Sequence, residues 1–145
     1  MHRRSLLTIL SAIMPASLIA ARAEAATPVQ SKVAYHLADL DQVEFVLGNI
    51  KNHFTSMGGP DKVTIALVVH GPALKAFHSA GASAEVTQRT DQLKKSGLAL
   101  HACGNTMRAQ SVALKDLLPG FVVADEGGVV KLAALQAQGY VYLRP

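Results

Sequence analysis

Apolar residues along this chain form two alternating patterns, a helical spacing and short continuous runs. Between the strands predicted below, apolar positions recur every three or four residues, which is typical of helices. Lys62–Val69 is apolar at almost every position, which indicates a strand covered on both faces, as in a parallel sheet between helices. Short apolar runs rich in β-branched residues predict strands over residues 32–37, 62–69, 98–103, 121–124 and 140–143.

Glycine, proline and short polar residues mark the ends of the first two predicted helices. Asp41, with Glu44 three residues later, is expected to cap a helix that ends at Gly58. Pro72 suits the first position of a second helix, which Gly81 should stop. Each helix therefore has a local start and stop signal.

The later helices have similar signals. Ser83 is expected to cap a helix that Gly97 terminates. A helix is predicted over residues 106–118, irregular near Ser111, and the last helix over residues 129–138. Every predicted strand is thus followed by a helix or by the chain end.

This alternation predicts the α/β fold class. Short loops between strands and helices favour a mostly parallel five-stranded sheet with helices on both faces. A chain of 145 residues suits one such domain, and we find no internal repeat or linker. In this class, ligands bind outside the carboxyl ends of the strands.

The first 25 residues have the pattern of a secretory signal peptide. Arg3-Arg4 precedes an apolar stretch, and Ala23-Glu24-Ala25 suits cleavage before Ala26. The arginine pair is compatible with twin-arginine export, and the general secretory route stays open. We therefore predict a periplasmic or otherwise exported protein, a mature domain over residues 26–145, and no membrane span after cleavage.

Charge argues against a nucleic-acid partner. The formal charge is +4, but removing the leader leaves 11 basic and 9 acidic residues. No cluster of lysine and arginine with interleaved aromatic residues remains, so nucleic-acid binding has no electrostatic support.

Cys103 is the candidate reactive residue. It is the only cysteine, at the end of a predicted strand and just before a predicted helix. Backbone N–H groups and the helix dipole at such a junction favour the thiolate. The alternative is a buried structural thiol, because a free cysteine often packs as a small hydrophobe. A reactive Cys103 would need an external thiol to resolve its products.

Three histidines are candidate partners of the thiol. His70 also ends a strand, and it would face the same crevice as Cys103 if the two strands are neighbours. It could act as a base, form a hydrogen bond to the sulfur or contact another subunit. The alternative is a histidine whose ring is hydrogen-bonded within a turn and has no further role. His101 projects from the same strand face as Cys103, two residues away. His36, near the end of the first strand, could line the crevice.

The remaining candidate binding residues surround these side chains. Gly71 follows His70, and Gly104 begins the turn after Cys103. Asn105 and Thr106 are expected as turn and N-cap residues, or as groups that orient an anion or a persulfide. No close pair of metal ligands and no G-x-S-x-G motif is present, so we predict neither a metal, a cofactor nor a hydrolase.

Several motifs together resemble the DsrE/DsrF-like family. They are VVHGPAL (Val68–Leu74), HACGNTM (His101–Met107) and the ending LLPGFVVADEGGVVKLAALQAQGYVYLRP (Leu117–Pro145). The resemblance implies a DsrE-like α/β domain assembled as trimers or hexamers. In the sulfur-relay members, a cysteine placed like Cys103 accepts sulfur as a persulfide and passes it to a partner.

Those members are cytoplasmic, so their partners and pathways do not carry over to a chain that is expected to be exported. The leading hypothesis is a sulfur-carrier or thiol-handling domain that uses Cys103 within a homo-oligomer, with an external sulfur donor or acceptor. The alternative is a non-enzymatic ligand-binding or assembly module in which Cys103 is structural.

Overall fold

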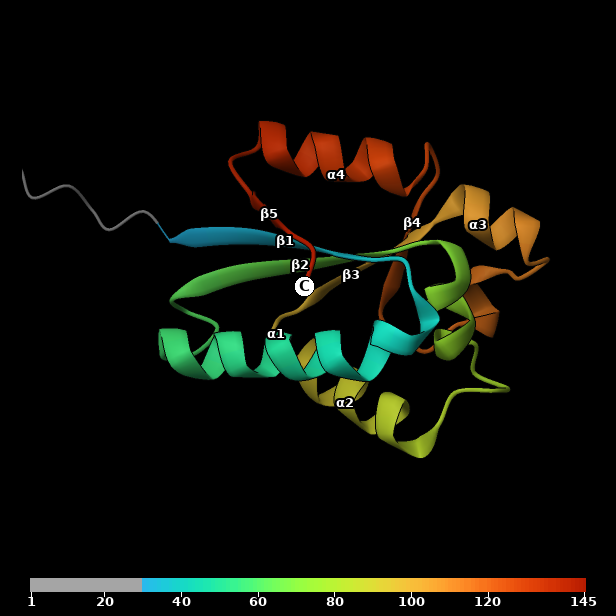
Figure 1. The fold of residues 1–145 in the computed structure, drawn as a ribbon, viewed down its shortest axis with the longest axis horizontal. Coiled ribbons are helices and arrows are strands. Elements are labelled where there is room, and N and C mark those ends of the chain that lie inside the picture. Colours follow the sequence, from blue (N-terminus) through green and yellow to red (C-terminus); the bar gives the residue numbers. More distant parts are fainter. Residues whose placement is uncertain (1–29) are drawn as a thin grey trace, which may run out of the picture.

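One parallel sheet forms the centre of the molecule. The computed structural model describes residues 30–145, so the predicted signal peptide lies outside the described residues. Neighbouring strands are all parallel, in the order β4-β3-β2-β1-β5 (Figure 1). The predicted five-stranded α/β sheet is confirmed. The strands are β1 (Ser31–Leu37), β2 (Val63–Val69), β3 (Ala99–Cys103), β4 (Phe121–Ala124) and β5 (Val141–Leu143).

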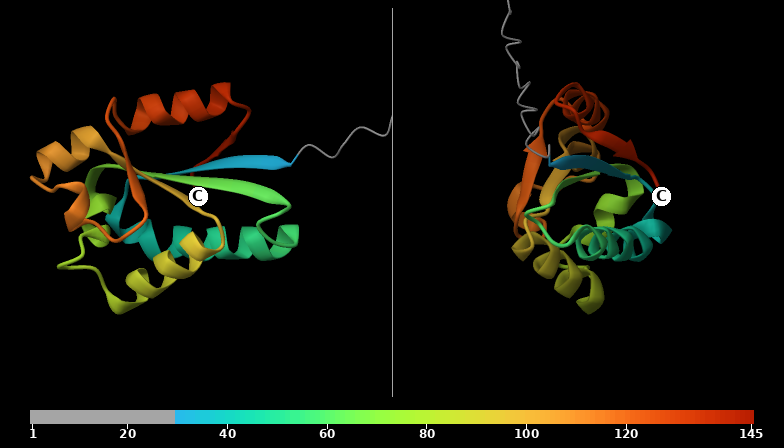
Figure 2. Two further views of the ribbon diagram at one scale, coloured as in Figure 1. Left: turned by 180° about the vertical axis from the view of Figure 1, so that it is seen from behind. Right: turned by 90° about the vertical axis from the view of Figure 1, so that its left-hand side faces the viewer.

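Helices cover both faces of the sheet, as predicted. Helices α1 and α2 lie on one face and α4 lies on the other (Figure 2). Within residues 30–145, no helix has the length and apolar character needed to cross a membrane. The α-helices are α1 (Val43–Met57), α2 (Ala84–Lys95), α3 (Gly104–Ala109) and α4 (Gly128–Ala137), and the 3-10 helices are η1 (Leu40–Gln42), η2 (Gly71–Phe77) and η3 (Leu114–Asp116).

Strand alternation gives each face its own core. The larger core joins the sheet to α1 and α2, whereas a smaller cluster lies under α4. Two alanines on the α4 face, Ala34 and Ala66, are completely or almost completely buried, and their small side chains suit close approach of the helix. Because successive side chains point to opposite faces, His36, His70 and Cys103 project toward the α4 side.

Two of the predicted helix boundaries match the structure. Gly58 follows the last residue of α1 with a φ of 89°, a left-handed conformation that glycine adopts without a Cβ penalty. The Ser83 side chain accepts a hydrogen bond from the Val86 N–H at 3.1 Å and so caps α2.

Two other boundary predictions were wrong. Asp41 does not cap α1: it lies inside η1, and α1 begins after Gln42 with no side-chain cap. The helix predicted to run from Pro72 to Gly81 is the 3-10 helix η2, which ends at Phe77. Both segments follow the ends of the neighbouring strands β1 and β2, and the Ala73 N–H donates to the Ala38 carbonyl oxygen at 2.9 Å. A hydrogen bond between distant segments therefore shapes these two places, beyond what the local capping pattern predicts.

The helix predicted over residues 106–118 is also wrong, because α3 ends at Ala109. Ser111 has a φ of 54°, which breaks the helix. Further on, Leu118 donates its N–H to the Phe77 carbonyl at 2.8 Å, and Leu117 bridges His78. These long-range bonds replace helical ones and bury Leu117 and Leu118. Over residues 110–118, tertiary contacts therefore determine the backbone conformation in place of the local helical pattern.

Candidate functional site

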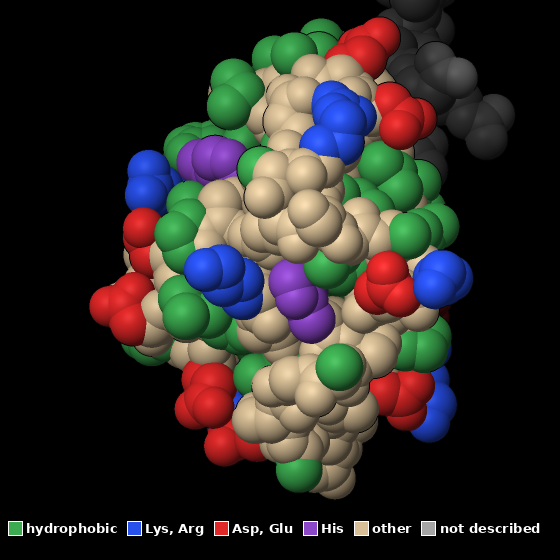
Figure 3. Space-filling view, turned by 90° about the vertical axis from the view of Figure 1, so that its right-hand side faces the viewer, with side chains coloured by type: hydrophobic (Ala, Val, Ile, Leu, Met, Phe, Trp, Pro, Cys, Tyr) green, Lys and Arg blue, Asp and Glu red, His purple; other side chains and the backbone are tan. Residues whose placement is uncertain are grey.

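The candidate site lies at the carboxyl ends of β2 and β3. Val69 pairs with Ala102, so the residues that follow them, His70 and Cys103, lie side by side. The sequence predicted that His70 and Cys103 face the same crevice only if the two strands are neighbours. The structure shows that they are neighbours. Figure 3 views this end of the molecule, where histidine side chains reach the surface among scattered acidic and basic groups.

Gly128, the first residue of α4, covers this pair. A Cβ added at Gly128 would lie 3.3 Å from the Cβ atoms of both His70 and Cys103. Contacts this close are tighter than ordinary van der Waals contacts, so a side chain at position 128 would require its neighbours to shift by a few tenths of an ångström. The glycine therefore allows the start of α4 to approach the two strand ends.

The Cys103 sulfur lies in a polar environment although the residue is only 4% exposed. Burial raises the pKa of the Cys103 thiol. The Thr106 hydroxyl and the backbone N–H groups of Thr106, Gly128 and Asn105 act in the opposite direction by hydrogen bonding to the sulfur. The net result is a thiol pKa below its ordinary value, so these donors favour the thiolate.

Thr106 connects this environment to β2. The Gly71 N–H donates to Thr106 Oγ1 at 2.9 Å, so the hydroxyl hydrogen is free to point at the sulfur. Thr106 is the third residue of α3, and Cys103 itself occupies the N-cap position, so the predicted N-cap role of Thr106 was wrong. The helix begins earlier than expected because Gly104 and Asn105 are already helical.

Two residues that the sequence analysis missed hold Gly71 in place. Gln110 donates from Nε2 to the Gly71 carbonyl oxygen at 2.9 Å, and its Oε1 lies 2.9 Å from Nε2 of His78. A possible sequence signal was the position of Gln110, four residues after Thr106 and so on the same face of a helix. The N–H and the carbonyl oxygen of Gly71 are therefore both hydrogen-bonded to side chains.

Gly104 and Asn105 shape the opposite wall. A Cβ on Gly104 would lie 3.0 Å from the Ala124 carbonyl oxygen, so this position requires glycine for close packing of α3 against β4. The Asn105 side chain accepts a hydrogen bond from Arg108 and lies against Gly127. Asn105 is therefore part of α3 rather than of a separate turn.

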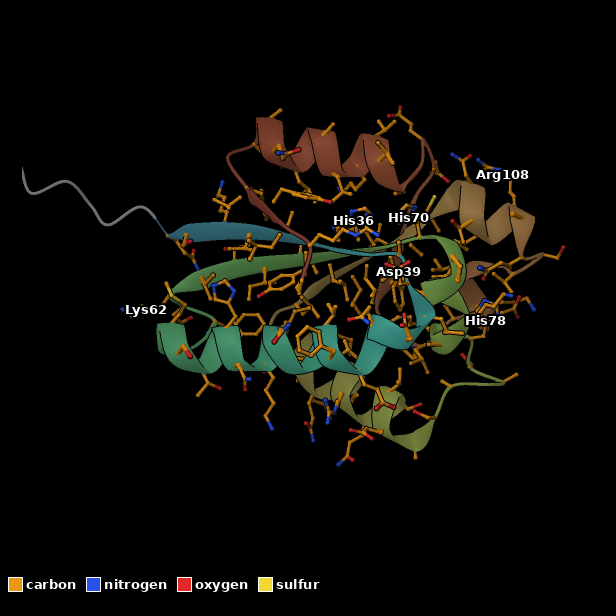
Figure 4. The ribbon with its side chains drawn as sticks, viewed as in Figure 1. His36, Asp39, Lys62, His70, His78 and Arg108 are labelled. Atoms are coloured by element: carbon orange, nitrogen blue, oxygen red, sulfur yellow. The ribbon has the colours of Figure 1, made fainter. Side chains whose placement is uncertain are left out.

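A second cluster extends from His70 away from the cysteine. Nε2 of His70 contacts Nε2 of His36, and the two rings are stacked with centroids 4.6 Å apart. Figure 4 shows these side chains together, on the side of β1 that faces α4. Nδ1 of His36 lies 2.6 Å from the hydroxyl of Tyr142, on β5. Tyr142 was missed in the sequence because it is 106 residues from His36.

The electrostatics of this cluster favour neutral histidines. Burial is the main cause that lowers the pKa of both His36 and His70, and the positive charge of Arg144 lowers both further. The pKa of His36 is also lowered by its interaction with His70. Asp39 raises both pKa values, but it is paired with Arg144 at 3.0 Å.

His101 lies on the same strand face as Cys103 but is not bonded to it. Burial and then the charge of Lys131 lower the pKa of His101 from 6.5 to about 4. In the described part of the chain, no hydrogen bond joins the sulfur to His101 or His70. His101 therefore packs beneath α4 as a neutral ring, and any effect on the thiol is indirect.

The described residues include no group of three or more His, Cys, Asp or Glu side chains placed to hold a metal ion. What the site does present is one buried thiol with hydrogen-bond donors around its sulfur and, next to it, two imidazoles whose pKa values are lowered. Such a thiolate can attack electrophilic sulfur, and a neutral imidazole can accept a proton.

Comparison with known proteins agrees with this architecture. A search of curated proteins found no match. MTH1491, a protein of unknown function from Methanobacterium thermoautotrophicum, has 26% identity and a TM-score of 0.69 over 79% of this chain and 99% of its own. The ychN protein from E. coli has a TM-score of 0.61 at 14% identity, over 80% and 99%, a likeness of fold alone. The model of the DsrE/DsrF-like family matches residues 19–145, and this chain belongs to that family.

Proposed function

We propose that the protein carries sulfur on Cys103 as a persulfide. The observation that supports this proposal is the ring of hydrogen-bond donors around the sulfur, which lowers the pKa of the thiol despite burial. A thiol that serves only to fill an apolar core would have its pKa raised by burial with nothing to oppose it.

The loading step is an attack on sulfane sulfur. The Cys103 thiolate forms a bond to the terminal sulfur of a polysulfide or persulfide donor, the S–S bond of the donor breaks, and its electron pair leaves on the donor's remaining sulfur. Because the chain has no second cysteine, an internal disulfide cannot form. The acceptor of the sulfur must therefore be an external molecule.

Burial restricts which donors reach the thiol. Cys103 lies beneath Gly128, which is buried at the start of α4. A persulfide would extend the reactive sulfur by about 2 Å beyond Cys103 Sγ. Small inorganic donors should react first, whereas a protein partner requires movement of the exposed Asp125–Glu126 turn.

The competing function is a ligand-binding or assembly module in which Cys103 is structural. Its 4% exposure favours this alternative. However, Cys103 belongs to neither of the two apolar clusters of the described residues, and the Thr106 hydroxyl and three backbone N–H groups act on its sulfur as hydrogen-bond donors. A purely packing role does not account for those donors.

Intact mass after incubation with sodium polysulfide tests the proposal. We expect Cys103 to gain sulfur atoms that dithiothreitol removes, and Cys103→Ser to gain none. Thermal denaturation of Cys103→Ser is the control for the structural alternative, since a packing thiol would show mainly as lost stability. If the wild-type protein gains no sulfur and its alkylation rate equals that of a free thiol, the carrier function is wrong.

We also propose that the protein acts outside the cytoplasm as a homo-oligomer. The family resemblance supports assembly, and the two most exposed large apolar side chains of the described residues, Val129 (67%) and Val122 (59%), both lie on the α4 side of the sheet. Light scattering of the purified mature domain tests the assembly. N-terminal sequencing of protein recovered from the periplasm tests cleavage before Ala26.

A further inference from the structure

Three side chains, from β1, from β5 and from the residue that follows β2, form a continuous chain of contacts beside the thiol. His70 meets His36 through their Nε2 atoms, and Nδ1 of His36 meets the Tyr142 hydroxyl at 2.6 Å. His70 is half-buried, His36 is 9% exposed and Tyr142 is 38% exposed, so the most buried member lies between two that reach the surface. At its inner end, His70 and Cys103 both contact the position of Gly128.

Each contact in this chain holds one hydrogen, and the direction of donation decides what His70 can do. If His70 Nε2–H donates to His36, then His36 Nδ1–H donates to the Tyr142 oxygen. Nδ1 of His70 then keeps its lone pair. Nδ1 makes no hydrogen bond to another described residue, so that lone pair is available to an incoming proton donor.

We propose that His70 is the general base that deprotonates a thiol acceptor of the Cys103 sulfur, with His36 as the positioning residue that accepts the His70 Nε2–H and Tyr142 as the positioning residue that accepts the His36 Nδ1–H. This inference rests on the proposed carrier function and identifies the acceptor class as a thiol. It also assigns a role to Tyr142, which lies far from the thiol along the chain.

The unloading step balances without an added oxidant or reductant. The acceptor R–SH gives its proton to Nδ1 of His70, and the thiolate forms a bond to the outer sulfur of Cys103–S–SH. The S–S bond of the persulfide breaks, and its electron pair remains on Cys103 as the thiolate. The products are R–S–SH, the Cys103 thiolate stabilised by the surrounding donors, and a His70 imidazolium.

The surroundings of the histidine pair suit this role. A base must be neutral before it acts, and burial together with Arg144 holds the pKa of His70 below its ordinary value of 6.5. After proton transfer, His36 accepts the Nε2–H of the imidazolium and shares its charge. The charged or titratable groups that face the pair are Arg144 and Asp39, Tyr142 on β5, and Cys103 on the other side of Gly128.

The test compares two acceptors that differ in whether a proton must be removed. Protein loaded with polysulfide and desalted is mixed at pH 8 with glutathione or with sulfite, and loss of the persulfide is followed by intact mass. Sulfite attacks as an anion and needs no base. We expect His70→Gln to slow transfer to glutathione by about tenfold or more, and to change transfer to sulfite by less than about twofold.

Equal slowing with both acceptors, or no slowing with either, would overturn the role of His70 while leaving the carrier function intact. Failure of the wild-type protein to load sulfur would instead overturn the carrier function, and the inference with it. The two failures are therefore distinguishable by the loading measurement alone.

A second set of variants tests the same role without removing the base. Arg144→Gln should move the pH inflection of transfer to glutathione upward, because it removes a charge that lowers the His70 pKa, whereas Asp39→Asn should move it downward. Tyr142→Phe should lower the glutathione rate and leave the sulfite rate unchanged. Shifts in the same direction for the Arg144 and Asp39 variants would contradict the proposal.

Discussion

Gly71 and Thr106 are joined by a hydrogen bond of 2.9 Å from the Gly71 N–H to Thr106 Oγ1, which links the end of β2 to the first turn of α3. This bond uses the hydroxyl as an acceptor, so its own hydrogen is free for the Cys103 sulfur. The orientation of the thiol's main side-chain donor is thus set by the neighbouring strand end.

Replacing Thr106 with valine should make Cys103 less reactive. The Thr106 hydroxyl lowers the pKa of the thiol, so its loss raises that pKa and reduces the thiolate fraction at pH 7. The rate of iodoacetamide alkylation at pH 7 should fall on the order of tenfold, since hydrogen bonds to charged groups are worth about 1.5–3 kcal/mol. Thr106→Ser, which keeps the hydroxyl, is the matched control, and equal rates for the two variants would contradict the assignment.

Gly104→Ala should destabilise the fold. The new Cβ would lie 3.0 Å from the Ala124 carbonyl oxygen and 3.1 Å from the Asp125 Cα, and backbone atoms cannot easily move aside. We expect a loss of about 1–3 kcal/mol in the free energy of unfolding, measured by urea denaturation. Gly81→Ala, where a Cβ meets nothing within 4 Å, should be within about 0.5 kcal/mol of the wild type.

Gly128→Ala should hinder sulfur loading at little cost in stability. Its Cβ would lie 3.3 Å from the Cβ atoms of Cys103 and His70, so the neighbours need to shift by only a few tenths of an ångström. The added methyl group still occupies the space above the thiol. The initial rate of polysulfide loading should fall at least about threefold, and the urea midpoint should change little. An unchanged loading rate would show that sulfur approaches from another side.

Stability should decrease as the pH falls below 6.5. The folded-state pKa values of His36, His70 and His101 are all lowered, that of His101 to about 4. Between the folded and unfolded pKa values the unfolded chain binds more protons, so the free energy of unfolding rises with pH and this contribution is complete above 6.5. For His101 the shift corresponds to at most about 3 kcal/mol.

Urea denaturation between pH 4.5 and 7.5 measures this dependence, and His101→Gln should flatten it. Lys131→Gln should flatten it less, because the charge of Lys131 is the smaller cause of the lowered pKa of His101. A pH dependence that is the same in His101→Gln and in the wild type would contradict burial of a neutral His101.

Local pattern predicted most of the secondary structure. The apolar run over residues 121–124 coincides with β4, and the Ser83 cap begins α2 as expected, because alternation and capping depend on neighbours in sequence. The prediction failed over residues 106–118. There Leu118 bonds to Phe77 and Leu117 bridges His78, at the end of η2 and about 40 residues away along the chain, and these contacts outweigh a weak helical pattern.

The candidate site was predicted in part. Cys103, His70 and His36 are recognisable because they stand at the ends of apolar runs, where ligands of α/β proteins bind. Tyr142 and Gln110 carried no such signal. Their contacts depend on which strands are neighbours and on the angle at which α3 leaves β3, and neither is encoded in a local spacing.

The sequence by itself therefore determined the alternation of strands and helices, the family, and the position of the single cysteine at a strand end. Only the tertiary structure decided that β1, β2 and β3 are adjacent, so that His70 lies between His36 and Cys103, and that the start of α4 covers the thiol. The physical reason is that periodicity and capping act over a few residues, whereas strand order and helix approach depend on packing between distant segments.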